Sequence, residues 1–127
     1  MHNNRRWSVE FFEAFEVEFH SLKEEVQVQL LAHAKLLEEF GSLLGRPHVD
    51  TLKDSAHPNL KELRFDADGG VWRVAFAFDP ERKAILLVAG DKSGGSKRSF
   101  YKQHIAKADS RFNEHLTKLM KSQKIKR

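Results

Sequence analysis

The sequence predicts a small α+β domain that combines a largely antiparallel sheet with an N-terminal helical hairpin and a C-terminal helix, in the order β-α-α-β-β-β-α. Between residues 12 and 40, and again after residue 97, apolar side chains recur at the three- and four-residue spacing of helix faces. Between residues 60 and 90 they alternate with polar ones or form short apolar runs, as in strands. At 127 residues the chain fits one domain, 1–127, with a core over about residues 7–119 and a basic tail over residues 120–127.

The N-terminal third is expected to contain one strand and two helices. Residues 7–12 (WSVEFF) are aromatic and β-branched enough for the strand. A capping-box pattern of Ser21 and Glu24 predicts the start of the second helix. Gly45 followed by Pro47 predicts its end. The apolar stripes of the two helices are Phe12, Phe15, Phe19 and Leu22, and then Val26, Leu30, Ala34, Leu37 and Phe40.

A meander of three strands is expected after residues 46–58, whose prolines and turn formers predict an irregular connection. LKELRF, from Leu60, reads as the first strand, and Asp68-Gly69-Gly70 as the turn that follows it. VWRVAFAF at residues 71–78 is the second strand. AILLVAG at residues 84–90 is apolar enough for a central strand.

The two faces of the middle strand are predicted to differ. Its bulky side chains share one face, which should pack on the helices. The other face carries Arg73 beside Ala75 and Ala77, which leaves room for something to lie on it. After a glycine-broken loop at residues 90–95, the final helix is expected to pack through Ile105, Ala108, Phe112, Leu116 and Leu119.

Composition excludes several classes of site. The chain has no cysteine, which rules out disulfides, thiolate nucleophiles and cysteine-ligated zinc. Its seven histidines form no HExxH motif or close pair, so we expect neither a metal nor another cofactor. The N-terminus lacks the apolar region of a secretory signal, and no apolar run reaches the roughly 18 residues of a membrane span. We therefore expect a cytoplasmic protein without membrane contacts.

Charge is unevenly distributed along the chain. Residues 1–58 hold 6 Lys/Arg against 10 Asp/Glu, whereas residues 59–127 hold 16 against 8. This asymmetry favours a polyanion or an acidic partner bound by the C-terminal part. A solvated lysine-rich helix is the plainer alternative.

Four residues could together cut RNA without a metal, because the 2′-OH of RNA is its own nucleophile. Arg64 and Arg73 lie in neighbouring predicted strands and suit the charge of a phosphorane. Neighbouring cations would lower the pKa of Lys92 and would favour a tyrosinate at Tyr101, the only tyrosine. The alternative is that each arginine simply pairs with a carboxylate such as Glu62 or Asp91. His57 and His104 are more typical of surface residues than of catalysts.

The segments LLGRPHVDTLKDSAHPNLKELRF, WRVAFAFDPERKAILLVAGDKSG and KRSFYKQHIAKAD carry a resemblance that covers about Trp7 to Leu119. They resemble the RelE/ParE toxin superfamily, in particular its phage-derived HigB-like branch. The resemblance implies the RelE fold and the toxin of a type II toxin–antitoxin module. Such a toxin would be a ribosome-dependent mRNA endonuclease that inhibits translation. Its partners would be a cognate, often DNA-binding, antitoxin, with which it could form a hetero-oligomer, and mRNA on the ribosome with its ribosomal RNA.

The resemblance also implies roles for individual residues. Arg64 and Arg73 would contact the phosphate, Lys92 would transfer a proton or contact phosphate, and Tyr101 would stack on a base or transfer a proton. His104 is a minor candidate for proton transfer. The RNA backbone would be held by Lys53, Lys97, Arg98 and Lys102. Two other functions remain open, a ParE-like toxin that poisons gyrase and a non-catalytic basic RNA-binding or interaction domain.

Overall fold

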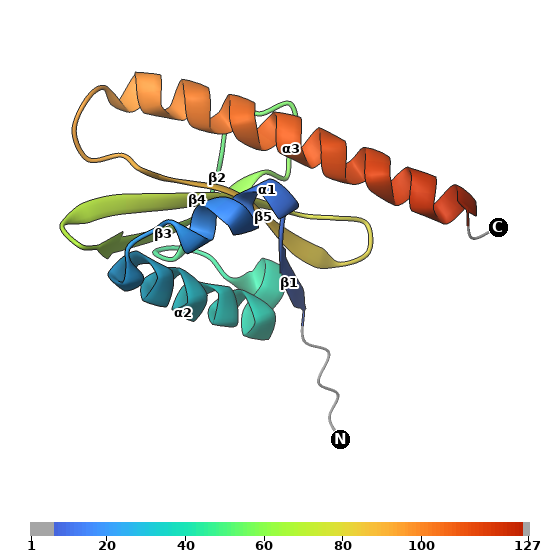
Figure 1. Cartoon of the computed structure of the whole chain (residues 1–127), viewed down its shortest axis with the longest axis horizontal. Coiled ribbons are helices and arrows are strands. Elements are labelled where there is room, and N and C mark those ends of the chain that lie inside the picture. The colour runs from blue at the N-terminus through green and yellow to red at the C-terminus, as the bar shows by residue number, and fades with distance from the viewer. Residues whose placement is uncertain (1–6, 126–127) are drawn as a thin grey trace.

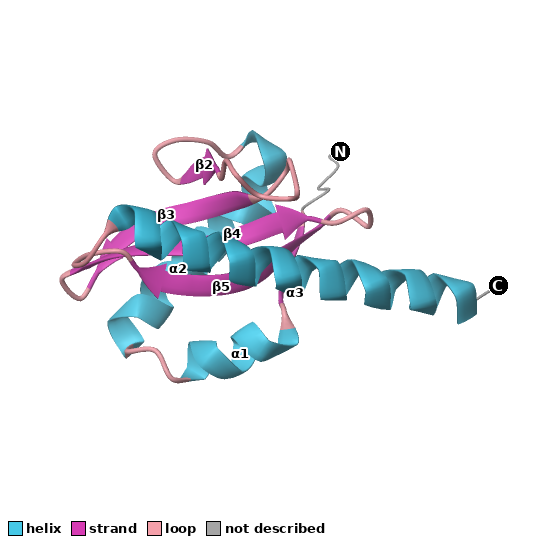
Figure 2. Ribbon diagram, turned by 90° about the horizontal axis from the view of Figure 1, so that it is seen from above, coloured by secondary structure: helices cyan, strands magenta, loops and turns pink. Residues whose placement is uncertain are grey.

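The structure is a computed structural model that describes residues 7–125, which form one five-stranded sheet with helices on both faces (Figures 1 and 2). The strands are β1 (Ser8–Phe11), β2 (Val49–Thr51), β3 (Lys61–Ala67), β4 (Gly70–Phe78) and β5 (Lys83–Asp91). The helices are α1 (Glu13–His20), α2 (Glu24–Phe40) and α3 (Lys97–Ile125), with the 3-10 turn η1 (Gly41–Leu43) after α2. The predicted α+β class is confirmed, and β2 is one strand more than the sequence indicated.

The strands lie in the order β1-β5-β4-β3-β2. Only the pairing of β1 with β5 is parallel, and β2 to β5 pair in antiparallel fashion. The predicted central strand AILLVAG falls in β5, between β1 and β4. Its side chains from Ala84 to Leu87 are at most 1% exposed, as expected for a strand covered on both faces.

Helix α2 covers one face of the sheet, below it in Figure 1. Leu30 and Leu37 of its apolar stripe are completely buried. The ring of His33 lies 5.1 Å from that of Phe65, whose side chain therefore points to this face of β3. Since neighbours alternate along a strand, Glu62 and Arg64 of β3 point to the opposite face.

Helix α3 covers that opposite face, above the sheet in Figure 1. The sequence left this face of β4 open, with room beside Arg73 and Ala75. In the structure the first half of α3 fills that room, which leaves Arg73 6% exposed and Ala75 completely buried. The predicted packing residues Ile105, Ala108 and Phe112 are buried. The second half of α3 extends past the sheet, while α1 lies beside β5 (Figure 2).

The predicted ends of α2 are wrong in detail. Ser21 does not cap α2. It terminates α1, and its backbone N–H donates to the carbonyl of Glu18, while α2 begins after Lys23 without a side-chain cap. The helix ends at Phe40 rather than at Gly45, because Gly41 adopts a φ of 54° that continues no right-handed helix.

The connection expected to be irregular over residues 46–58 is only partly so. Val49–Thr51 form β2, which pairs with Lys61–Leu63 at the edge of the sheet. The backbone N–H of Arg64 also donates to the carbonyl of His48, so the residue just before β2 is bonded to β3 as well. This short strand brings Asp50 to the side of Arg64 and so contributes to the site described next.

Candidate functional site

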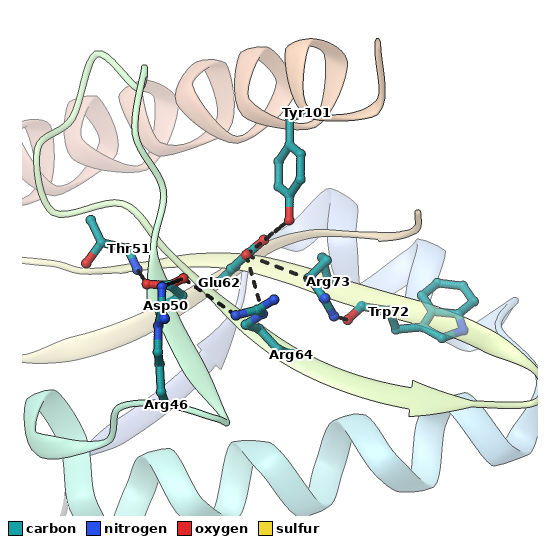
Figure 3. Close-up of polar contacts among 8 residues, drawn as sticks. All are labelled: Arg46, Asp50, Thr51, Glu62, Arg64, Trp72, Arg73 and Tyr101. Atoms are coloured by element: carbon teal, nitrogen blue, oxygen red, sulfur yellow. Dashed lines mark hydrogen bonds and ion pairs between the residues drawn. The ribbon is translucent and has the colours of Figure 1, made fainter. Parts of the chain in front are cut away.

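Glu62 is the centre of a polar cluster on the sheet face beneath α3 (Figure 3). The register of β3 and β4 places Arg64 directly opposite Arg73. Glu62 Oε2 lies 3.8 Å from Arg64 Nε and 3.9 Å from Arg73 Nε. From above, the Tyr101 hydroxyl of α3 lies 3.1 Å from each carboxylate oxygen and donates to it. Two strands and a helix thus converge on one carboxylate that is only 4% exposed.

A second carboxylate extends this cluster toward solvent. Asp50 of β2 lies 3.5 Å from Arg64 Nη1 and accepts a 2.9 Å hydrogen bond from Arg46 Nη2. The hydrogen bond from Arg46 is the main reason that the pKa of Asp50 is below its usual value. Arg64 therefore lies between two carboxylates, whereas Arg73 faces Glu62 and donates through Nη1 to the carbonyl of Trp72.

Two hydrogen-bond donors of this cluster lack an acceptor in the described part of the chain. Within residues 7–125, Nε of Arg64 and Nε of Arg73 are buried without a hydrogen-bond partner, since Glu62 lies too far from each for a good bond. Buried polar groups are normally satisfied, so two unpartnered Nε–H groups on either side of one carboxylate need an explanation. An anion with more oxygens than one carboxylate would satisfy both.

Lys92 adds a further cation to the cluster. Its backbone N–H donates to the carbonyl of Val71, which fixes the end of β5, and its Nζ lies 6.0 Å from the centre of the Tyr101 ring. The pKa of Lys92 is lowered, first by burial and then by the charges of Arg73, Lys97 and Arg64. The direction expected from the sequence is confirmed, although burial contributes more than the neighbouring cations.

The expectation of a tyrosinate at Tyr101 is wrong. Its pKa is raised, first by burial and then by the negative charge of Glu62. The sequence placed cations near this ring but not the carboxylate that its hydroxyl contacts. In this structure Tyr101 is a neutral hydrogen-bond donor.

Glu62 is the one central residue that sequence reasoning did not count as part of the site. It appeared there only as a possible partner of the arginines, and the structure confirms that pairing for both. Burial raises its pKa, against the opposing effects of the Tyr101 hydroxyl and the two arginines. Asp91, the other suggested partner, instead accepts from the backbone N–H groups of Val71 and Ser93. The signal available in the sequence was strand alternation, which puts Glu62 and Arg64 on one face.

Of the residues expected to hold RNA, three lie on the first turns of α3. Lys97, Arg98 and Lys102 are exposed there, and the side chain of Arg98 lines the same hollow as those of Tyr101 and Lys102. Lys53 is exposed in the connection between β2 and β3.

The two histidines considered have partners that differ in kind. The expectation of a surface position is wrong for His104, which is 5% exposed and stacks on Phe100 at 4.8 Å between ring centres. Burial, followed by the charge of Arg73, lowers the pKa of His104 to about 4, so its ring is neutral at physiological pH. His57 lies 2.8 Å from Asn113 of α3 through Nε2, which gives it a structural contact.

The described part of the chain offers neither a metal-binding group of side chains nor a membrane-spanning helix. Over residues 7–125, no three His, Cys, Asp or Glu side chains are grouped so that they could hold a metal ion. In the same range, no helix has the length and the apolar character needed to cross a membrane.

Comparison with known proteins gives three similarities. Residues 17–113 match the model of the family described as phage-derived protein Gp49-like. Two Mycobacterium tuberculosis proteins named as toxin candidates are similar. HigB2 is 45% identical over 96 residues, which are 75% of this chain and 47% of HigB2, so the chain spans about half the length of that relative. HigB3 is 45% identical over 93 residues, 73% of this chain and 79% of HigB3.

The fold also has a counterpart among solved structures. A double-arginine mutant of the E. coli toxin RelE, in its free state, superposes with a TM-score of 0.56 and covers 80% of this chain and 96% of its own. At 16% identity this likeness shows a shared fold and says nothing of individual residues.

Proposed function

The chain belongs to the Gp49-like family of phage-derived proteins, and from that premise we propose that it is the toxin of a type II toxin–antitoxin pair that cuts mRNA on the ribosome without a metal. Its HigB-like relatives and its RelE-type fold support the coarser statement that it is a toxin of such a pair. The cutting of mRNA, the dependence on the ribosome and action in the cytoplasm are the finer parts of the proposal.

One observation carries the proposal. Arg64 and Arg73 meet across β3 and β4, and the Nε–H group of each is buried and unpartnered around the carboxylate of Glu62. A planar guanidinium matches the oxygens of a phosphate and stays charged at every relevant pH. Two such groups on either side of one carboxylate favour a phosphodiester with a developing extra charge, which is the transition state of RNA cleavage.

The remaining groups can move the protons. The 2′-OH must lose a proton to attack the phosphorus, and the departing 5′-oxygen must gain one. Glu62, with its raised pKa, and Lys92, with its lowered pKa, are both closer to neutral pH than ordinary side chains of their types. Either can accept the first proton. Tyr101 is a neutral donor and can give the second or stack on a base.

The cluster is covered in this structure, and binding of RNA must uncover it. Glu62 is 4% and Arg73 6% exposed beneath the first half of α3, from which the Tyr101 hydroxyl contacts Glu62. The side chain of Arg64 is 29% exposed and can make the first contact. We infer that a phosphate enters beside Arg64 as the Tyr101 side chain leaves Glu62, and that its oxygens then satisfy both arginine Nε–H groups.

Exposed cations supply affinity around this centre. Lys97, Arg98 and Lys102 lie on the first turns of α3, and Lys53 lies in the β2–β3 connection. Such residues bind the sugar–phosphate backbone of mRNA or ribosomal RNA with little sequence preference. A cognate antitoxin would neutralise the toxin in a hetero-oligomer.

The test is to induce the wild-type protein and Arg73→Ala in bacteria and to map mRNA 5′ ends over the following minutes. We expect new cuts inside translated regions with the wild type, none when translation is blocked, and none with Arg73→Ala. Lys35→Ala is the matched control, since it removes one exposed positive charge from α2 on the other side of the sheet. It should cut like the wild type.

Two results would contradict the proposal. Growth arrest with intact mRNA would indicate a protein target, as in gyrase poisoning. Unchanged cutting by Arg64→Ala, Arg73→Ala and Lys92→Ala proteins would show that the cluster is not the site.

A further inference from the structure

The hollow lined by Arg98, Tyr101 and Lys102 adjoins the polar cluster through Tyr101. It has a volume of about 470 Å³ and lies between α3 and the connection from β2 to β3. Its lining residues are Asp54, Arg98, Tyr101, Lys102, Ile105, Ala106 and Asp109. Such a volume is in the range of small-ligand sites. Because the Tyr101 ring lines the hollow while its hydroxyl contacts Glu62, an occupant would lie next to the candidate cleavage centre.

The walls of this hollow are held in place. Asp109 of α3 accepts a hydrogen bond from the Ser55 hydroxyl and a 2.9 Å bond from the Ala56 backbone N–H. One turn further along α3, Asn113 contacts His57. These bonds tie the β2–β3 connection to the helix, so the hollow does not depend on a loose loop. They also engage both oxygens of Asp109.

Asp54 differs from Asp109 in having no such partner. Its side chain makes no hydrogen bond or ion pair within residues 7–125, although its backbone is held at a φ of 67°. This conformation is uncommon for a residue other than glycine, and the exposed side chain lines the hollow. The hollow thus has an aromatic and aliphatic surface from Tyr101 and Ile105, one unengaged carboxylate, and two cations, Arg98 and Lys102.

These features fit a nucleobase with its flanking phosphates. A base can stack on the Tyr101 ring, which is the usual way proteins hold unpaired RNA bases. Arg98 and Lys102 can contact the phosphates on either side. The two cations and two carboxylates nearly cancel in charge, so the hollow itself suits an uncharged group.

We propose that this hollow binds an unpaired guanine next to the scissile phosphate and that Asp54 recognises it. A carboxylate only accepts hydrogen bonds, so the base must offer donors. Guanine alone offers two adjacent donors, N1–H and N2–H, on its Watson–Crick edge, which match the two carboxylate oxygens. Adenine and cytosine offer one amino group beside an acceptor, and uracil one N–H between two acceptors. This inference rests on the proposed function, because it assigns base selection to the same enzyme.

The experiment has two parts. In the first, the purified protein is titrated with each of the four nucleoside 3′,5′-bisphosphates, which carry one base and both flanking phosphates. We expect the guanosine compound to bind about tenfold or more tightly than the other three, as a bidentate contact provides. Asp54→Asn should lose this preference. Asp66→Asn, which makes the same charge change at an exposed site on β3, should keep it.

In the second part, cut sites are mapped in cells for the same variants. With the wild type and Asp66→Asn, we expect enrichment of G at one fixed position beside the cut. With Asp54→Asn, that enrichment should be lost, whereas the total number of cuts should fall by a smaller factor than the enrichment does. Guanosine preference in the titration without any cutting in cells would contradict the proposed function and leave the guanine site standing. Cutting with equal binding of all four compounds, and unchanged base frequencies with Asp54→Asn, would overturn the guanine site alone.

Discussion

Arg64 and Arg73 are directly opposite each other on β3 and β4, and the same oxygen of Glu62 lies within 3.8 and 3.9 Å of their Nε atoms. Two like charges opposite each other on a sheet destabilise it unless something compensates. Glu62 compensates for them when the site is empty, and a phosphate would do so when the site is occupied. We therefore predict that phosphate binding depends on the same three residues that form this buried cluster.

Replacing Glu62 by Gln should not destabilise the protein at pH 7. Burial raises the pKa of Glu62 despite the two arginines and the Tyr101 hydroxyl, so the charged carboxylate is the less favourable form in the folded protein. The neutral amide removes that charge, and its oxygen can still accept a hydrogen bond from the Tyr101 hydroxyl. We expect the free energy of unfolding to be equal to or above that of the wild type, which urea unfolding would measure. Glu24→Gln, on the exposed start of α2, should stay within about 0.5 kcal/mol of the wild type.

The free energy of unfolding should depend on pH through the protonation of Glu62. Its pKa is higher in the folded protein than the ordinary value of 4.5, so the folded state binds more protons than the unfolded state in that interval. The contribution of Glu62 to the free energy of unfolding is therefore fully present below pH 4.5. It is lost as the pH rises through the folded pKa. Urea unfolding at a series of pH values should show this decline in the wild type but not in Glu62→Gln, and equal slopes would contradict it.

The sequence predicted that Arg64 and Arg73 lie in neighbouring strands, because the signals of strands and turns are local. Strand alternation and the turn at residues 68–70 are enough to place Arg64 opposite Arg73. They do not show that α3 returns over this face and brings Tyr101 onto Glu62, since a contact across 39 residues leaves no local pattern. For this reason three expectations were wrong or incomplete. They are the open face of β4, the tyrosinate at Tyr101 and the minor role given to Glu62.

The start of α2 was mispredicted for a similar reason. Ser21 and Glu24 have the spacing of a capping box, but the chain uses Ser21 to end α1. The residue that leads into α2 is Lys23, which forms an ion pair of 3.1 Å with Asp68 in the β3–β4 turn. The capping-box spacing is a local signal, and here the chain uses that serine at the end of a helix.

The end of α2 gives a direct test of the fold. A Cβ atom at Gly41 would lie within 1.8 Å of Trp7 Nε1, and the φ of 54° is itself strained for other residues. Gly41→Ala should therefore cost at least about 2 kcal/mol of unfolding free energy. Gly45→Ala is the matched control, because nothing lies within 4 Å of its Cβ position. Thermal unfolding of the two variants should separate them, and equal stabilities would contradict the packing of Trp7 on Gly41.

The role of Lys92 can be divided into charge and proton transfer. Its lowered pKa means that its neutral form appears at a lower pH than for an ordinary lysine. If it accepts the proton of the 2′-OH, the cleavage rate should rise with pH up to that pKa. Lys92→Arg keeps the positive charge but cannot lose a proton. We expect it to cut RNA at least about a hundredfold more slowly. Cutting by Lys92→Arg near the wild-type rate would instead assign Lys92 to phosphate contact and leave Glu62 as the base.

Tyr101→Phe should separate the hydroxyl from the ring. The Tyr101 hydroxyl is the largest influence that lowers the pKa of Glu62, so removing it should raise that pKa further. The pH at which Glu62 loses its proton, followed by NMR of its carboxyl carbon, should move upward. The lost hydrogen bond to a buried carboxylate should cost about 1–3 kcal/mol of unfolding free energy. The phenyl ring still stacks, so the guanosine preference should survive while cleavage slows. Loss of both together would show that the hydroxyl also shapes the hollow.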